Sequence, residues 1–139
     1  MNFTRRDALI LGAGAATVAL LPVQAFASPV DDAIAAFTGG AATTEGGIEL
    51  TAPEIAENGN TVPVSVSAPG AVSIILISTG NPVPDVCTFN FGALSGSQFG
   101  STRIRLAGTQ DVIAVAKMAD GSFVQTSSVV KVTIGGCGG

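Results

Sequence analysis

The chain has 139 residues, with 6 Lys and Arg, 10 Asp and Glu, a net charge of -4, two cysteines and no histidine. Without histidine there is no Ser-His-Asp or Cys-His pair and no imidazole metal ligand. Two cysteines alone cannot build a zinc or iron-sulfur site. The few, dispersed basic residues argue against a nucleic-acid partner. The two thiols are therefore the only strong nucleophiles in a chain long enough for one domain.

The first 27 residues have the pattern of an export signal. The pair Arg5-Arg6 is followed by an apolar run from Ala8 to Leu21 and by the small-x-small cleavage site Ala25-Phe26-Ala27. These features predict a twin-arginine signal over residues 1–27, a periplasmic location and no membrane attachment after cleavage. A membrane anchor is the alternative, but the apolar run of about 14 residues is shorter than the ~20 that a spanning helix needs.

The segment after the predicted cleavage site has the local signals of a helix. Ser28 is a suitable cap, a proline follows at the first helical position, and two acidic residues face the positive end of the helix dipole. A short apolar face comes next, and Gly39-Gly40 provides the stop. We expect one short helix from Pro29 to Phe37.

The rest of the chain is typical of short β-strands. Seven runs with a period of two are separated by Gly, Pro, Asn and Ser: Ile48 to Ile55, Thr61 to Ser67, Ala71 to Thr79, Val86 to Phe91, Thr102 to Leu106, Asp111 to Met118 and Ser122 to Ile134. This spacing predicts an all-β fold over residues 28–134, an immunoglobulin-like antiparallel β-sandwich preceded by the short helix.

Two of the predicted strands are apolar on both faces, at residues 73–77 and 112–116. A two-layer sandwich buries only one face of each sheet, so these strands need a further cover. The helix and the loops could provide it, or a second subunit could. Only 12% of the residues are charged, and an exposed apolar patch marks an interaction site. We therefore favour a second subunit.

The C-terminus carries one of the two thiols between four glycines, Gly135, Gly136, Gly138 and Gly139. Glycine has no side chain to pack and the most conformational freedom, so we expect a flexible arm over residues 135–139 with Cys137 at its centre. No histidine or basic residue lies beside this thiol to activate it. Such an arm suits delivery of a bound group to another protein. The chain is thus predicted to have no catalytic residue and no metal site.

The second thiol, Cys87, alternates in phase with Phe89 and Phe91 and is predicted to lie in the core as a small hydrophobe. The alternative is a Cys87–Cys137 disulfide, which is common in exported proteins and, by closing a loop of ~50 residues, would contribute about 4 kcal/mol. The glycines argue against it, because they add freedom that the bond would remove. A disulfide-stapled sandwich with a structural or adhesive role remains the alternative function. A thiol oxidoreductase ranks third, because the chain has no Cys-x-x-Cys.

The terminal Gly-Gly-Cys-Gly-Gly, preceded by Val130 to Ile134, resembles the SoxY family, the sulfur-carrier subunits of the periplasmic Sox thiosulfate-oxidation system. The twin-arginine leader and the segments Pro29 to Phe37, Ile48 to Glu54 and Ser101 to Ala107 are also similar to segments of that family. The resemblance implies that Cys137 carries sulfur covalently, first as a thiosulfonate and later in persulfidic forms, without a cofactor.

The same resemblance implies a set of partner proteins. A companion subunit of the SoxZ type would form a heterodimer with the chain. A c-type cytochrome complex would load the thiol, and a di-manganese hydrolase would release sulfate. In some organisms a sulfane dehydrogenase would oxidise the remaining sulfur. In this reading the chain itself is a carrier rather than an enzyme, because its partners do the chemistry.

Overall fold

The computed structural model describes residues 27–136, so the predicted export signal lies almost wholly outside the described residues. Helix α2 (Pro29–Thr38) begins at a capping box. The hydroxyl of Ser28 accepts a hydrogen bond from the backbone N–H of Asp31, and the Asp31 carboxylate accepts one from the N–H of Ser28. Gly39 ends the helix in the left-handed region, with φ 66°. The predicted helix is confirmed, with its start at Pro29 as predicted and its end at Thr38, one residue later than predicted.

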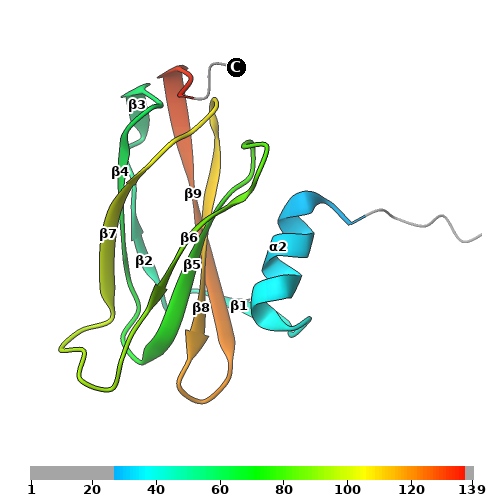
Figure 1. Ribbon diagram of the computed structural model, residues 1–139, viewed down its shortest axis with the longest axis vertical. Helices are drawn as coiled ribbons and strands as arrows, with labels where there is room; N and C mark the ends of the chain where they lie inside the picture. Colours follow the sequence, from blue (N-terminus) through cyan, green and yellow to red (C-terminus); the bar gives the residue numbers. More distant parts are fainter. Residues whose placement is uncertain (1–26, 137–139) are drawn as a thin grey trace, which may run out of the picture.

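Two sheets pack face to face beside this helix (Figure 1). The strands among the described residues are β1 (Thr43–Glu45), β2 (Glu49–Thr51), β3 (Ile55–Asn58), β4 (Val62–Ser67), β5 (Ala71–Ser78), β6 (Asp85–Asn90), β7 (Phe99–Ile104), β8 (Gln110–Met118) and β9 (Phe123–Ile134). One sheet has the order β1-β9-β8-β5-β6, with β3 also paired to β9, and the other has the order β2-β4-β7. The predicted fold class, an all-β sandwich with a short N-terminal helix, is confirmed.

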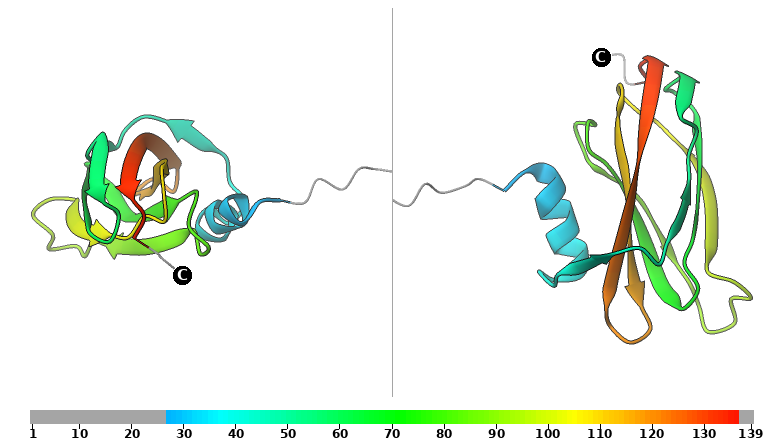
Figure 2. Two further views of the ribbon diagram at one scale, coloured as in Figure 1. Left: turned by 90° about the horizontal axis from the view of Figure 1, so that it is seen from above. Right: turned by 180° about the vertical axis from the view of Figure 1, so that it is seen from behind.

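The segment between α2 and β4 crosses from one sheet to the other and back, as Figure 2 shows. β1 lies parallel to the first residues of β9, β2 pairs with β4, and β3 returns to lie parallel to the last residues of β9, with Ile55 opposite Lys131. The prediction of one continuous strand from Ile48 to Ile55 is wrong. The chain leaves the ladder around Pro53, which has no N–H to donate.

The core between the sheets is built from the alternating inward side chains of the longer strands. Its buried members are Val62, Val64 and Val66 of β4, Ile74 and Leu76 of β5, Val112, Ala114 and Ala116 of β8, Val130 of β9, and Ile104 and Leu106 at the end of β7. The clean alternation predicted for β4 is confirmed by its burial pattern. The core reaches Leu106, so it extends to the end of the sandwich where β9 ends.

Helix α2 covers the opposite face of β5 and β8. On that face Ile75, Ile77 and Val115 are at most 7% exposed. The helix packs on them through Val30, Ala33, Ile34 and Phe37, whose spacing places them on one helical face. The ring of Phe37 also meets that of Phe123 edge to face, 6.0 Å apart. The prediction that a second subunit covers these doubly apolar strands is therefore wrong.

Candidate functional site

The predicted site follows directly from β9, at the end of the sandwich marked C in Figure 1. β9 ends at Ile134, as the sequence predicted. Gly135 and Gly136 belong to the described residues, whereas Cys137 and the two glycines after it lie outside them. The geometry of the site is thus that of the last two described residues and of the loops around them.

Three segments are joined at this end by a ring of backbone hydrogen bonds. The N–H of Gly59, in the β3–β4 turn, donates to the carbonyl of Ile134 at 2.7 Å. The N–H of Leu106, in the β7–β8 loop, donates to the carbonyl of Gly59 at 2.8 Å, and the N–H of Gly136 donates to the carbonyl of Leu106 at 2.8 Å. We call these three bonds the clasp. They tie the first residues after β9 to the body of the sandwich.

The clasp requires glycine because its backbones touch. A Cβ added to Gly59, Gly135 or Gly136 would overlap a backbone carbonyl oxygen of the facing segment. None of the three has a positive φ, since the positive-φ glycines of the described chain lie elsewhere. Close approach of two backbones, rather than an unusual conformation, is therefore what selects glycine here.

The position of the predicted flexible arm is corrected by this geometry. The sequence placed its start at Gly135, but Gly136 is buried and hydrogen-bonded, and Gly135 lies against the carbonyl of Ala107. Glycine serves close packing of backbones as well as freedom, and the sequence does not distinguish the two uses. The part of the predicted arm that remains, Cys137 to Gly139, lies outside the described residues.

The side chain of Gln110, only 7% exposed, hydrogen-bonds to the β5–β6 and β7–β8 loops. Its Nε2 donates to Oδ1 of Asn81 and to the carbonyl of Gly108, both at 3.0 Å. Its Oε1 accepts from the N–H of Gly80 at 2.8 Å. All three of these bonds end on the β5–β6 or β7–β8 loop, so Gln110 joins the two loops.

Asn81, in the β5–β6 loop, completes this support. Its Nδ2 donates to the carbonyl of Arg105 at 2.8 Å, and its Oδ1 accepts from the N–H of Ala107 at 2.9 Å. These contacts hold the residues on both sides of Leu106, the central residue of the clasp. We call Asn81 and Gln110 the brace.

Sequence reasoning missed the brace, although one signal pointed to it. Gln110 begins β8 in phase with the buried Val112 and Ala114. A polar side chain on the inward face of a strand must find hydrogen-bond partners, because leaving it unpaired there is costly. Asn81 carried no comparable signal, since an asparagine in a loop is ordinary.

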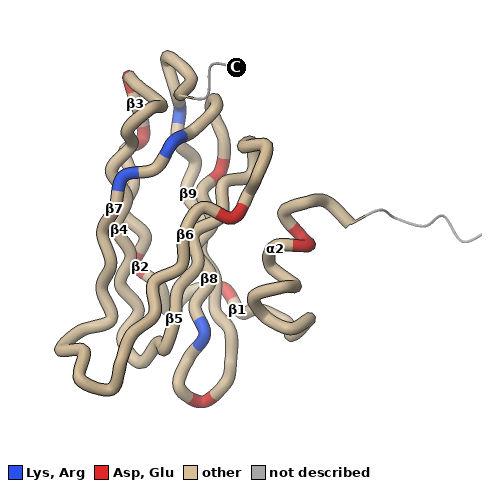
Figure 3. The backbone as a smooth tube through the Cα atoms, viewed as in Figure 1, with Lys and Arg blue, Asp and Glu red and all other residues tan. Residues whose placement is uncertain are grey.

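Charged residues gather at the clasp end of the sandwich (Figure 3). Of the four Lys and Arg residues in the described chain, Arg103, Arg105 and Lys131 lie on the strand ends or loops there. The acidic Glu57 of β3 and Asp111 of β8 lie at the same end. The surroundings of the exit point are therefore mixed: these charges lie beside the exposed apolar side chains of Ile55 and Ile134, and the clasp itself is uncharged backbone.

Cys87 lies on β6, opposite Leu76 of β5, and packs against the core between the sheets. It is a free, half-buried cysteine, and burial raises the pKa of its thiol. The prediction of a core-facing thiol is confirmed in its contacts, but burial is incomplete because β6 is the edge strand of its sheet. A less populated thiolate makes Cys87 a poor nucleophile near neutral pH.

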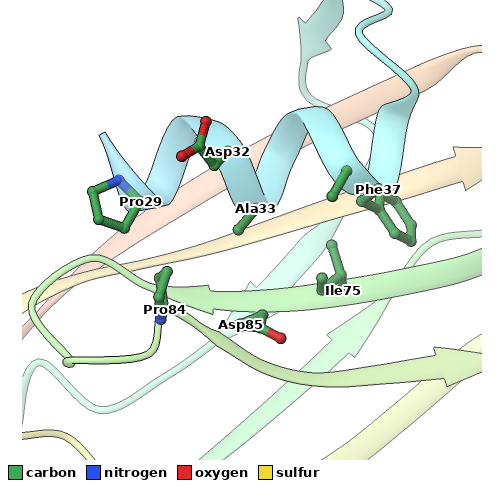
Figure 4. A pocket seen from close by; sticks show the side chains of 8 residues that line it. Pro29, Asp32, Ala33, Phe37, Ile75, Pro84 and Asp85 are labelled. Carbon is green, nitrogen blue, oxygen red and sulfur yellow. The ribbon is translucent and has the colours of Figure 1, made fainter. Parts of the chain in front are cut away.

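A groove of about 530 Å³ runs between α2 and the adjoining ends of β5 and β6. Figure 4 shows Ala33 and Phe37 of the helix above Ile75, with Asp32 and Asp85 nearby. Its floor is apolar, and its lining residues include no thiol or amine that could act as a nucleophile. The groove therefore carries no reactive group of the kind that the sequence assigned to Cys137.

Neither a cluster of metal-ligating side chains nor a membrane-spanning helix is found in residues 27–136. No three His, Cys, Asp or Glu side chains are grouped closely enough there to hold a metal ion. No helix in that part of the chain is both long and apolar enough to cross a membrane.

Comparison with known proteins gives one family and two groups of similar structures. The family described as "Sulfur oxidation protein SoxY" matches residues 34–137. A structure of the sulfur carrier protein SoxY from Chlorobium limicola f thiosulfatophilum is 36% identical, with a TM-score of 0.68 over 75% of this chain and 91% of that one. No curated protein gives a significant match.

The second group consists of superoxide reductases. The enzyme from Ignicoccus hospitalis is 16% identical, with a TM-score of 0.54 over 61% of this chain and 79% of that one. A putative superoxide reductase from Thermotoga maritima is 17% identical, with a TM-score of 0.53 over 69% and 89% of the two chains. At these identities the likeness shows a shared sandwich fold alone.

Proposed function

Because the chain belongs to the SoxY family of sulfur-oxidation proteins, we propose that it is a sulfur carrier whose attachment site is the thiol of Cys137. The observation that carries the proposal is the clasp, which brings the chain out of the sandwich one residue before Cys137. The thiol is thus attached to a fixed point at one end of a rigid body. A group bound to it can be presented without unfolding any part of the fold.

Sulfur is loaded onto the thiol in one reaction and sulfate is released from it in a second. Thiosulfate and the Cys137 thiol form an S–S bond, giving Cys–S–S–SO₃⁻ with loss of the thiol proton and of two electrons. A c-type cytochrome complex accepts those electrons. Water then cleaves the terminal S–SO₃ bond, which leaves Cys–S–S⁻ and releases sulfate and two protons. A di-manganese hydrolase catalyses this second step, and a sulfane dehydrogenase, where present, oxidises the remaining sulfur.

The division of labour between carrier and enzymes is supported by composition. The chain has no histidine to act as a general base near neutral pH. Its other thiol, Cys87, packs against the core with a raised pKa. The carrier therefore supplies one thiol and its position, and the partner enzymes supply the acid-base, redox and metal chemistry.

A companion subunit of the SoxZ type pairs with the carrier at the end of the sandwich opposite the clasp. Leu94, Phe99 and Val72 are exposed there, Leu94 completely, and no residue from 86 to 102 is charged. An exposed, uncharged apolar surface is typical of an interface. A companion at this end leaves the clasp end open to the enzymes.

This interface is tested by size-exclusion chromatography of the carrier with its co-expressed companion. The double variant Leu94→Ser, Phe99→Ser is expected to weaken the complex about tenfold or more, because it removes two apolar anchors. Ile55→Ser is the matched control, since Ile55 is 62% exposed at the clasp end. Equal elution of all three carriers as complexes would disprove the assignment of the surface.

The carrier works in the periplasm after removal of residues 1–27. The capping box supports this cleavage site, because the backbone nitrogen of Ser28 lies 3.1 Å from the Asp31 carboxylate. After cleavage that nitrogen becomes the terminal ammonium, and the carboxylate would pair with it. Mass spectrometry of the periplasmic protein should give Ser28 as the first residue, and replacing Arg5 and Arg6 by lysine should block export.

Intact-mass analysis of protein from cells that oxidise thiosulfate tests the carrier role. We expect a mass increase on Cys137 that dithiothreitol removes, absent from Cys137→Ser and retained in Cys87→Ser. Cys137→Ser should also abolish thiosulfate-dependent turnover by the partner enzymes while the sandwich stays folded. A Cys87–Cys137 disulfide in the working protein would instead favour the stapled, structural alternative, against which the free Cys87 now stands.

A further inference from the structure

The clasp is not supported by backbone contacts alone. Its central residue, Leu106, uses both its N–H and its carbonyl to bind Gly59 and Gly136. The loop that contains Leu106 lies between the end of β7 at Ile104 and the start of β8 at Gln110. Its last residue, Thr109, accepts a hydrogen bond from the N–H of Val132 in β9 at 3.0 Å, which leaves the part around Leu106 to be held by other contacts. Whatever fixes this loop therefore fixes the point where the C-terminus leaves the sandwich.

The side chains of the brace hold the part of the loop around Leu106. Asn81 bonds to Arg105 and Ala107, the two neighbours of Leu106, and Gln110 bonds to Gly108 and to Asn81 itself. Gln110 is anchored in turn by Gly80 and by its own place in β8. The order of support therefore runs from β8 through the brace to the loop, and from the loop through the clasp to Gly136.

We infer that Asn81 and Gln110 are positioning residues for the carrier thiol, which hold the clasp closed so that Gly135 and Gly136, the two residues before Cys137, stay fixed to the sandwich. The inference rests on the proposed carrier role for its functional meaning, but its geometry does not depend on it. With the clasp closed, the Cα of Cys137 lies one peptide unit, about 3.8 Å, from a fixed Gly136. With the clasp open, three peptide units separate that Cα from the end of β9 at Ile134, a reach of about 10 Å.

The length of this tether decides how the thiol meets a partner. A short tether confines the thiol to a small volume at the end of the sandwich, which raises its effective concentration for a partner docked at that end. Opening the clasp spreads the same thiol over a larger volume. Loss of the brace should therefore raise the KM of partner enzymes for the loaded carrier and leave their kcat nearly unchanged.

A nitroxide spin label on Cys137, in a Cys87→Ala background, measures the tether without any partner. In the protein with an unaltered clasp, we expect the EPR spectrum to contain a component from a slowly moving label, the slow component. Gly136→Ala should remove it, because the added Cβ would overlap the carbonyl of Gly59. Gln110→Ala should also remove it, with a fall in the label's correlation time of about threefold or more on the nanosecond scale.

Two further variants separate positioning from general damage. Gln98→Ala is the matched control, since Gln98 accepts from the N–H of Gly70 at the opposite end of the sandwich; its spectrum should keep the slow component. Asn81→Asp should retain the slow component better than Asn81→Ala, because aspartate keeps the acceptor for Ala107.

The inference is overturned if Gln110→Ala, Asn81→Ala or both remain folded by circular dichroism and keep the slow component. It is also overturned if the parent protein lacks that component and matches Gly136→Ala. If Gln110→Ala fails to fold, Asn81→Ala tests the inference instead, because Asn81 lies in a loop rather than in a strand. If the label on the parent protein is mobile, while unlabelled protein still acquires sulfur on Cys137, the positioning role is refuted and the carrier role stays intact.

Discussion

Two pairs of glycines in this protein look alike in sequence and have different physical causes. Gly39 and Gly40 follow helix α2, and both have positive φ values with nothing within 4 Å of an added Cβ. Gly135 and Gly136 follow β9, have no positive φ, and touch facing carbonyls. The first pair is selected by backbone conformation and the second by close approach. A glycine pair in a sequence therefore indicates a constraint on the backbone, but it does not distinguish a positive φ from close approach of another backbone.

The largest loss of stability is expected from a substitution at Gly59, the clasp glycine in the middle of the chain. Gly59→Ala would force a Cβ against the carbonyl of Leu106 and the backbone of Gly136, atoms that cannot rotate away. We expect a loss of about 3 kcal/mol in the free energy of unfolding, measured by urea denaturation. Gly92→Ala is the control, since nothing lies within 4 Å of its added Cβ and its φ is not positive. Equal losses in the two variants would contradict close approach as the cause.

A smaller effect is expected at the helix end. Gly39→Ala places a side chain at φ 66° with open space around it, so the cost is conformational, about 1 kcal/mol. Gly39→Asn should cost less than Gly39→Ala, because asparagine tolerates the left-handed region. Thermal unfolding of both variants checks the order. If asparagine is no better than alanine, conformation is not what selects glycine at this position.

The smallest effect is expected at the other end of the same helix. Hydrogen bonds from the hydroxyl and the N–H of Ser28 hold the pKa of Asp31 below its ordinary value of 3.8. A lowered folded pKa stabilises the protein above the unfolded value, and this contribution is lost as pH falls through the folded value. The Tm of Asp31→Asn should therefore lie slightly below that of the parent at pH 7 and converge with it in stronger acid. Asp32→Asn, which removes a charge from the same turn and leaves the capping bonds in place, is the control.

The helix was predictable because its signals are local. The serine cap, the first-turn proline and the terminal glycine all act within a few residues of Pro29–Thr38. The alternation of β4 was equally readable, since one of its faces is buried and the other is not. The end of β9 at Ile134 followed from the same kind of alternation.

What could not be predicted depends on contacts between distant segments. The parallel pairing of β1 and β3 with β9 joins residues more than 70 positions apart, and no local pattern records it. The cover of β5 and β8 required knowing where α2 docks, and low charge suggested a subunit instead. The clasp and the brace bring four separate segments together at one end, and no local pattern in the sequence indicates that these segments meet.

The pairing of β3 with the last residues of β9 limits how other proteins can bind beside the tail. Near Lys131 one edge of β9 is occupied by β3, while β8 pairs with its other edge up to Val130. A partner therefore cannot extend the sheet along the edge of β9 that β3 occupies, because the backbone donors and acceptors on that edge are already used. A protein that binds beside this edge would have to recognise side chains and loop shape, because pairing with the backbone there is not open to it.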